Sequence, residues 1–227
     1  MLAIPEYTVF NSATECAEYT AEKILMAAEL AIQQRHQFKL VLAGGNTPNQ
    51  VYQLLAQANS DWSEWWIFWG DERCLAESKN SERNSWMAQQ IWLDQIPIPK
   101  SQIFPISAEK GAIIAAHDYE MIIRHYLPMD LVLLGMGEDG HTASLFPGQI
   151  HNANQWVHPV FNAPKPPAER VSLSVNALSA TAEVIFLITG ANKHQPFTQW
   201  QQGIDLPIVH IGGQKRMIYI DRNALMG

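Results

Sequence analysis

The feature that most constrains the fold of this chain is a repeated alternation between short apolar runs and longer amphipathic stretches. The apolar runs, typical of buried strands, cover residues 38–43, 65–69, 103–106, 130–134, 170–175, 183–189 and 216–220. The stretches with helical periodicity cover residues 12–34, 47–55, the residues after Asn84, 108–126 and 191–201. Alternating strands and helices indicate an α/β fold, for which we predict a single domain over residues 1–227. Its mainly parallel, Rossmann-like sheet should carry helices on both faces.

Local signals mark where two of the helices begin. Ser12 and Glu15 have the spacing of a capping box, in which hydroxyl and carboxylate each accept from free backbone amides. Thr47 is predicted to cap the next helix, with Pro48 as its first residue. The proline-rich stretch 163–168 is interpreted as a surface loop, because a strand resumes directly after it.

Charge and cysteine content exclude several classes of protein. The net charge is −7, with 15 Lys+Arg against 22 Asp+Glu, whereas general nucleic-acid binding needs a basic surface. Cys16 and Cys74 have no metal-ligand spacing, so we predict two reduced thiols and no metal. No apolar run reaches the ~18 residues of a membrane span, and residues 1–10 lack the basic start of a secretory signal. We therefore expect a cytoplasmic monomer with no nucleic-acid or membrane partner.

Glycine-rich or charged segments follow four of the predicted strands, where ligands bind in sheets of this type. They are Gly44-Gly45-Asn46-Thr47, Asp71-Glu72-Arg73, the run 135–148 that contains Asp139 and His141, and Gly190-Ala191-Asn192-Lys193. Taken alone, the glycine turn is equally well an ordinary strand-to-helix turn, and Asp-Glu-Arg is better interpreted as a solvated turn. Their coincidence at equivalent strand ends favours a binding site.

Three of these segments carry specific chemistry. His141 titrates near neutral pH, so a positioned imidazole at a strand end is suited to act as a general base. Lys193 lies in the predicted first turn of a helix, where a cation opposes the helix dipole unless it serves a bound anion. The glycine turn at another helix N-terminus exposes backbone N–H groups to an anion.

In this order and at this spacing, the segments resemble the 6-phosphogluconolactonase family. The resemblance runs from Leu40 to Lys193 and is carried by residues 42–48, 71–73, 84, 130–148, 170–172 and 190–193. Its most specific part runs from Asp139-Gly140-His141 to Pro147-Gly148. Asn46 stands where the family usually has Ser, and Ser172 where it usually has Thr; both keep the capacity for hydrogen bonds.

The resemblance implies hydrolysis of 6-phospho-D-glucono-1,5-lactone to 6-phosphogluconate, in the oxidative pentose phosphate pathway. A lactone is an activated ester, so its hydrolysis needs a base for water and a cation or donors for the oxyanion. No cofactor, metal or covalent nucleophile is expected, and the sequence contains no Gly-x-Ser-x-Gly motif. We assign His141 as the base, Asp139 as its orienting carboxylate and Arg73 as the ligand of the lactone carbonyl.

The remaining candidate residues are assigned to substrate binding. For the phosphate they are Gly44, Gly45, Asn46, Thr47, Arg170 and Lys193; Asp71 and Asn84 would hold sugar hydroxyls or support neighbouring groups.

Two other functions stay open at the level of sequence. An aminosugar-phosphate isomerase/deaminase shares the glycine turn and the Asp-Gly-His, but it usually has a Glu after the His, where residues 142–148 contain no carboxylate. It also usually has Tyr at the position of Arg73. A non-catalytic sugar-phosphate sensor is disfavoured by the joint presence of His141, Asp139 and Arg73. The tryptophans at 62, 65, 66 and 69 could form core or a partner surface, and we favour core.

Overall fold

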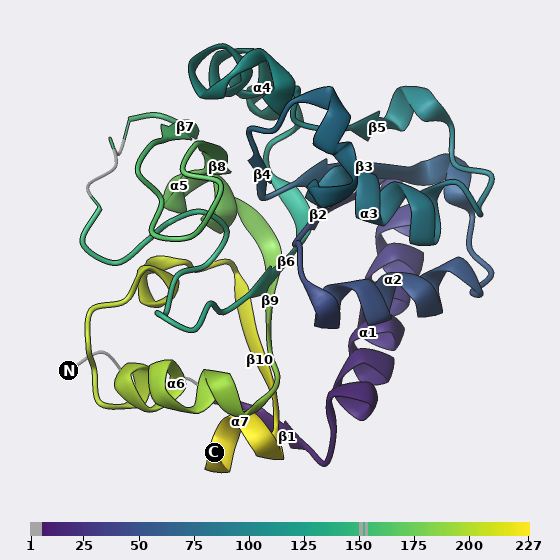
Figure 1. Cartoon of the computed structure of the whole chain (residues 1–227). Coiled ribbons are helices and arrows are strands. Elements are labelled where there is room, and N and C mark those ends of the chain that lie inside the picture. The colour runs from purple at the N-terminus through teal and green to yellow at the C-terminus, as the bar shows by residue number, and fades with distance from the viewer. Residues whose placement is uncertain (1–5, 150–151, 153) are drawn as a thin grey trace.

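The computed structural model describes residues 6–149, 152 and 154–227 (Figure 1). Residues 1–5, in the segment inspected for a secretory signal, and residues 150, 151 and 153 lie outside the described residues.

The large sheet is parallel throughout the described part of the chain. Its strands are β1 (Thr8–Phe10), β2 (Phe38–Leu42), β3 (Trp65–Trp69), β5 (Ile103–Phe104), β6 (Met129–Gly135), β9 (Thr181–Ile188) and β10 (Lys215–Asp221). Their order across the sheet is β1-β10-β9-β6-β2-β3-β5. β2, β6 and β9 are central and almost wholly buried, which agrees with their continuous apolar sequences.

Helices cover both faces of this sheet (Figure 1). They are α1 (Ala13–Arg35), α2 (Asn46–Ala56), α3 (Asn84–Ala88), α4 (Ala112–Tyr126), α5 (Val175–Ser179), α6 (His194–Gln201) and α7 (Arg222–Met226). α1 packs across β2, β6, β9 and β10 and against α2, while α5 and α6 lie on the opposite side. The predicted α/β fold with a mainly parallel sheet is confirmed. No helix in the described part is both long and apolar enough to span a membrane.

A second, antiparallel sheet is a feature that the alternation of elements did not indicate. It contains β4 (Asp71–Arg73), β8 (Arg170–Leu173) and β7 (Val157–Val160), in the order β4-β8-β7. The strand predicted at 170–175 therefore forms, but outside the large sheet. The interpretation of Asp-Glu-Arg as a solvated turn is wrong, because these residues pair with β8 and two of them are buried. β7 lies in a region for which the sequence predicted no strand.

One glycine joins the two sheets. The Gly70 N–H donates to the Leu42 carbonyl at the end of β2 (2.9 Å), and the Gly70 carbonyl accepts from the Leu173 N–H in β8 (2.8 Å). The chain thus leaves the large sheet at the end of β3 and enters the small one without an intervening loop. As a result, the small sheet stands beside the carboxyl ends of the parallel strands.

The helix boundaries follow local chemistry, with one correction at a cap. Ser12 Oγ accepts from the Glu15 N–H (3.1 Å), and Glu15 accepts from the Asn11 N–H (2.8 Å), so both capping-box side chains act as predicted. α2 begins at Asn46 with Gly45 as its cap, so the assignment of Thr47 as N-cap is wrong. Gly45 has φ of +114°, which is open to glycine and strained for other residues.

Three other predicted helices are divided into shorter pieces. Residues Ala108–Lys110 and Ala191–Lys193 form 3₁₀ turns ahead of α4 and α6. The helix after Asn84 continues from α3 into a π-helical turn, Gln89–Leu93. Further 3₁₀ turns are Trp62–Glu64, Glu77–Glu82, Lys100–Gln102 and Pro207–His210.

The tryptophan cluster belongs to the core, as favoured from the sequence. Trp62, Trp65 and Trp69 are at most 5% exposed, and only Trp66 is half-buried. The Trp62 and Trp65 rings lie 4.8 Å apart, and both contact the ring of Trp92. Packing of these large rings fixes β3 in the core, and with it the start of the segment that follows β3.

Candidate active site

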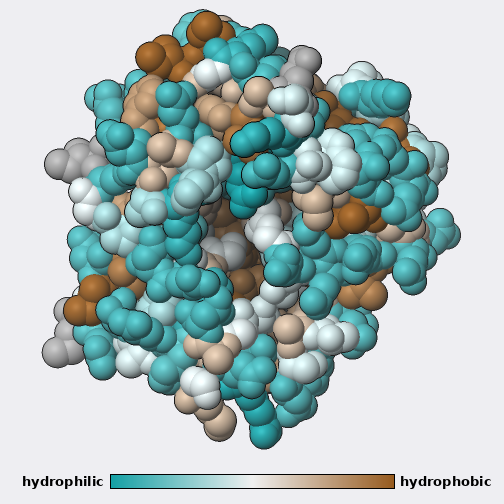
Figure 2. Space-filling view, in the orientation of Figure 1, coloured by the Kyte–Doolittle hydropathy of each residue, from teal (hydrophilic) through white to brown (hydrophobic). Residues whose placement is uncertain are grey.

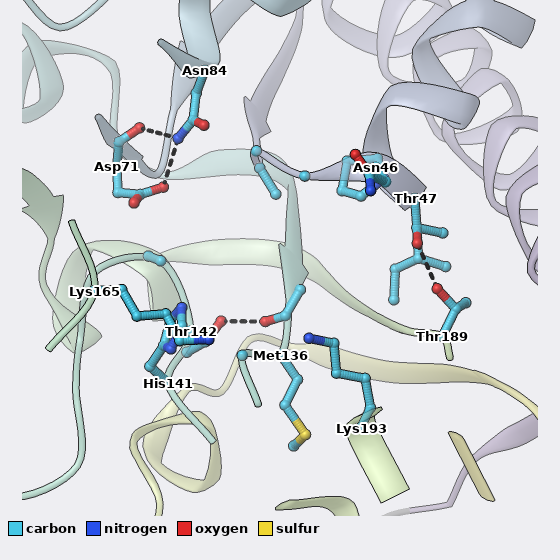
Figure 3. A pocket seen from close by; sticks show the side chains of 18 of the residues that line it. Asn46, Thr47, Asp71, Asn84, Met136, His141, Thr142, Lys165, Thr189 and Lys193 are labelled. Atoms are coloured by element: carbon cyan, nitrogen blue, oxygen red, sulfur yellow. Dashed lines mark hydrogen bonds between the residues drawn. The ribbon is translucent and has the colours of Figure 1, made fainter. Parts of the chain in front are cut away.

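A pocket of about 470 Å³ opens at the carboxyl ends of the central parallel strands (Figures 2 and 3). The predicted residues that line it are Gly44, Gly45, Asn46, Thr47, Asp71, Arg73, Asn84, His141, Arg170 and Lys193. Asp139 lies beside the pocket in contact with His141. The fold therefore brings together segments that are up to about 150 residues apart in the chain, as the strand-end pattern predicted.

His141 and Asp139 form a carboxylate–imidazole pair. Asp139 Oδ1 hydrogen-bonds to His141 Nδ1 and also accepts the His141 backbone N–H (3.3 Å), which leaves Nε2 as the ring nitrogen for a substrate. Burial lowers the pKa of His141 below its ordinary value, and the Asp139 charge offsets this only in part. For Asp139, burial alone would raise the pKa, but the charge and hydrogen bonds of His141 outweigh it and the pKa is lowered. A neutral imidazole next to an ionised carboxylate is the protonation state that a general base requires.

The ring of His141 fits closely against its own loop. A Cβ atom placed on Gly137 would lie 2.1 Å from the imidazole, so only glycine leaves room for the ring there. On another side, the ring of Phe146 lies 4.7 Å from the imidazole, centroid to centroid. The loop after β6 therefore fixes the direction in which the His141 ring points.

Arg73 is held by its buried neighbour Glu72. Glu72 Oε1 accepts from the backbone N–H groups of Arg73 and Asn84, each at 2.9 Å, and Oε2 accepts from the Ser85 N–H at 2.8 Å. Burial raises the pKa of Glu72 despite these bonds. Arg73 Nη1 donates to the Glu82 carbonyl (2.8 Å) while the residue lines the pocket. Glu72 thus connects β4 to the start of α3, a role that sequence reasoning missed.

Asp71 and Asn84 form a second connection beside the glycine turn (Figure 3). Asn84 Nδ2 lies 3.2 Å from Asp71 Oδ1, and the Ser144 hydroxyl donates to Asp71 Oδ2 at 2.6 Å. A Cβ atom on Gly44 would lie 2.0 Å from Asn84 Oδ1, so the amide packs directly on the glycine turn. These contacts tie together β4, α3, the glycine turn and the loop that carries His141.

The glycine turn and Lys193 face the pocket from its other side (Figure 3). Asn46 and Thr47 begin α2, whose first turn contains no acidic residue, and the Thr47 hydroxyl hydrogen-bonds to that of Thr189. The Lys193 side chain extends toward Met136. Burial lowers the pKa of Lys193, and the nearby Glu138 carboxylate opposes that shift. A helix N-terminus opposite a half-buried lysine is suited to an anionic group.

Arg170 lines the pocket, but its guanidinium is engaged with backbone. Nε donates to the Pro167 carbonyl (3.2 Å), and Nη2 donates to the carbonyls of Lys165 (3.0 Å) and Pro166 (3.2 Å). Its Cζ lies 5.5 Å from the centre of the Phe146 ring. Burial lowers the pKa of Arg170 without removing its charge. Arg170 therefore holds the proline-rich loop against the pocket.

Sequence reasoning did not select several residues that line the pocket. Thr142 and Met136 lie inside the glycine-rich run, and Thr189 directly follows β9, so the strand-end argument could have included them. Lys165 lies in the proline-rich loop, where no local signal distinguishes it from a surface lysine. Among the described residues, no group of three His, Cys, Asp or Glu side chains could hold a metal ion.

Comparison with known proteins gives one consistent family. Residues 11–219 match the family model described as glucosamine-6-phosphate isomerases/6-phosphogluconolactonase. A probable chloroplastic 6-phosphogluconolactonase 3 from Oryza sativa is 31% identical over 243 residues, covering 96% of this chain and 74% of that protein. The crystal structure of the Thermotoga maritima 6-phosphogluconolactonase superposes with a TM-score of 0.88 at 27% identity, over 95% of this chain and 99% of that one. A monomeric glucosamine-6-phosphate deaminase, with a TM-score of 0.84 at 18% identity over 97% and 98% of the two chains, shares the fold.

Proposed function

The chain belongs to the glucosamine-6-phosphate isomerase/6-phosphogluconolactonase family, and from this premise we propose that it hydrolyses 6-phosphogluconolactone to 6-phosphogluconate. The observation that carries the proposal is the His141–Asp139 pair, which faces the same pocket as Arg73 and Lys193. This set combines a general base, a cation for an oxyanion and a cation for a phosphate.

In the proposed reaction, His141 Nε2 takes a proton from water as the water oxygen bonds to the lactone carbonyl carbon. Arg73 stabilises the negative charge that develops on the carbonyl oxygen. The bond between the carbonyl carbon and the ring oxygen then breaks, and the ring oxygen leaves as a hydroxyl after taking the proton that His141 gained from water. Asp139 keeps the imidazole oriented and stabilises its charged form during the transfer.

The phosphate of the substrate is proposed to bind between the glycine turn and Lys193. The N-terminus of α2 supplies backbone N–H donors and the positive end of the helix dipole. Lys193 supplies the charge that a dianion needs. Asp71 and Asn84, which also line the pocket, are proposed to contact the sugar hydroxyls.

A deaminase function fits the pocket less well. Deamination of an aminosugar phosphate needs several acid/base groups facing the sugar, and residues 142–148 supply no carboxylate. Arg73 would also repel the ammonium group of such a substrate. The lactonase function is therefore the one we retain.

The test is hydrolysis of freshly prepared 6-phosphogluconolactone, followed against its spontaneous rate, with ammonia release from glucosamine 6-phosphate measured in parallel. We expect hydrolysis within seconds and no detectable ammonia at the same enzyme concentration. Ammonia release at a rate comparable to lactone hydrolysis would overturn the assignment. Failure of the enzyme to exceed the spontaneous rate would favour a non-catalytic sugar-phosphate-binding protein.

We also propose that the protein acts as a cytoplasmic monomer that does not bind nucleic acid. The acidic net charge of −7 supports the absence of nucleic-acid binding. Named relatives include chloroplastic proteins, so the location needs cell fractionation, and the oligomeric state needs light scattering.

A further inference from the structure

Two buried tyrosines that the proposed mechanism does not use make the same pair of contacts at the ends of neighbouring strands. Tyr52, in α2, donates its hydroxyl hydrogen to the Ala43 carbonyl (2.7 Å) and accepts the Ala43 N–H (3.0 Å). Tyr119, in α4, donates to the Trp69 carbonyl (3.1 Å) and accepts the Trp69 N–H (2.8 Å). Each hydroxyl therefore binds both backbone polar groups of one residue.

The two bound residues lie where pairing between strands ends. β2 ends at Leu42, one residue before Ala43. Trp69 is the last residue of β3, and the neighbouring strand β5 ends at Phe104, which is paired with Phe68. A buried N–H or C=O group beyond the end of a strand is costly unless another group binds it. The tyrosine hydroxyls supply that partner at both strand ends.

Each contact lies directly before a segment of the pocket. Ala43 precedes the glycine turn, and both line the pocket. Trp69 is followed by Gly70 and then by β4, which carries the pocket residues Asp71 and Arg73. Figure 1 shows α2 and α4 in separate parts of the molecule. The glycine turn is therefore fixed by one helix and the start of β4 by another.

Both hydroxyls stay protonated and are held in place by their surroundings. The side chains of Tyr52 and Tyr119 are each 1% exposed. Burial raises the pKa of both phenols, the backbone hydrogen bonds oppose that rise, and the charges of Asp71 near Tyr52 and of Glu72 near Tyr119 add to it. The Tyr52 ring also stacks on Trp92, with the ring centroids 5.6 Å apart. These hydroxyls therefore act as fixed hydrogen-bonding groups and not as acids or bases.

We propose that Tyr52 and Tyr119 are positioning residues for two different parts of the reaction. Tyr52 fixes the glycine turn for binding of the substrate phosphate, and Tyr119 fixes β4 so that Arg73 meets the developing oxyanion. The inference rests on the proposed function. An interaction made equally with substrate and transition state affects KM, whereas one made only in the transition state affects kcat. The two tyrosines therefore control different kinetic constants, although their contacts are alike.

The test compares Tyr52→Phe with Tyr119→Phe, since both changes remove the hydroxyl and keep the ring. Tyr52→Phe should raise the KM for 6-phosphogluconolactone about 10-fold, the effect of weakening a hydrogen bond to a charged group, with little change in kcat. Tyr119→Phe should lower kcat about 10- to 100-fold, the range for a misplaced catalytic group, with little change in KM.

Tyr219→Phe is the matched control. Tyr219 is 4% exposed, its hydroxyl donates to Met217 Sδ (3.2 Å), and it is not among the residues that line the pocket. Both kinetic constants of this variant should match those of wild type.

The role of Tyr52 has a readout that loss of folded protein does not change, because KM is independent of the amount of active enzyme. The KM for unphosphorylated glucono-1,5-lactone should stay as in wild type. A Tyr52→Phe variant with an unchanged KM for the phosphorylated lactone, or with equal rises for both lactones, would overturn this role.

The role of Tyr119 is separated from a general structural effect by a second change at Arg73. If Tyr119 acts through Arg73, the double variant Arg73→Ala/Tyr119→Phe should turn over no more slowly than Arg73→Ala alone. A further loss that adds to that of Arg73→Ala would overturn the role of Tyr119.

Amide hydrogen exchange in wild type tests both contacts without any variant. The Ala43 and Trp69 amides should exchange as slowly as those within β2 and β3, although they lie beside an open pocket. Exchange as fast as in exposed loops would overturn the inference. If wild type fails to exceed the spontaneous rate of lactone hydrolysis, the proposed function is wrong, while slow exchange at these two amides still supports the tyrosine contacts.

Discussion

At the scale of single residues, the pocket depends on a few side chains whose partners set their protonation state. The Asp139 carboxylate directs the His141 ring, and burial keeps that ring neutral near physiological pH. Gly137 leaves room for the imidazole, because any side chain at that position would occupy the space of the ring. The predictions for the His141–Asp139 pair and for Gly137 follow from these contacts.

His141→Ala should retain the fold and lose about 10²–10⁴-fold in kcat/KM, the usual contribution of a positioned general base. A variant His141→Ala that keeps more than about a third of wild-type activity would show that the base is misassigned.

In wild type, activity requires the neutral imidazole, so kcat/KM should fall as the pH drops through the His141 pKa, which lies below the ordinary 6.5. Asp139→Asn removes a charge that raises this pKa, so the fall in kcat/KM at acidic pH should move to still lower pH.

Gly137→Ala should impair catalysis more than stability. Its Cβ would lie 2.1 Å from the His141 ring, so the imidazole has to move out of its position against Asp139. A displacement of this size is expected to cost on the order of 10²-fold in kcat. Gly212→Ala, where a Cβ atom meets nothing within 4 Å and φ, as at Gly137, lies outside the positive region, is the matched control. Equal activity of the two variants would contradict the proposed contact.

At the scale of elements, the short strand β4 connects the two sheets and carries three charged residues with different roles. Asp71 and Arg73 face the pocket, whereas Glu72 is buried and binds the backbone of β4 and α3. Alternation along a strand explains this division, because successive side chains point to opposite faces. The buried carboxylate therefore positions two pocket residues without reaching the substrate.

Glu72→Gln should destabilise the protein by about 1–3 kcal/mol, the cost of leaving a buried polar group unsatisfied. The amide keeps one oxygen for the Arg73 and Asn84 N–H groups, but its NH₂ would face the Ser85 N–H. Chemical denaturation measures the loss, and Glu64→Gln, at a half-buried position directly before β3, is the control. A stability equal to wild type would show that Glu72 does not hold β4 to α3.

At the scale of the whole molecule, the pocket exists only where the two sheets meet. The glycine turn, the His141 loop and Lys193 come from the large sheet, while Asp71, Arg73 and Arg170 come from the small one. A ligand that contacts both sets stabilises the assembled chain relative to any state in which the sheets separate.

Saturating 6-phosphogluconate should therefore raise the melting temperature in a single transition. At 100 times Kd the stabilisation is about 2.7 kcal/mol, which corresponds to about 5–10 °C for a protein of this size. Gluconate, which lacks the phosphate, should raise it far less. Two separate transitions, of which only one responds to ligand, would contradict the prediction of a single domain.

The sequence by itself determined a mainly parallel sheet, six of its seven strands (all but β1), and the strand ends at which the pocket forms. Those features depend on local periodicity and on residues that are close in the chain, such as Asp139, Gly140 and His141. Local patterns therefore sufficed to place His141 and Asp139 together.

Only the tertiary structure decided the pairing of β4 with β8, the burial of Glu72 and the arrival of Lys165 at the pocket. Each depends on contacts between segments far apart in the chain. A short charged sequence such as residues 71–73 is compatible with a solvated turn and with a buried strand, so it does not distinguish the two. The physical reason is that burial and hydrogen-bond partners, which decide the role of a charged side chain, are properties of the assembled fold and not of the residue's neighbours in sequence.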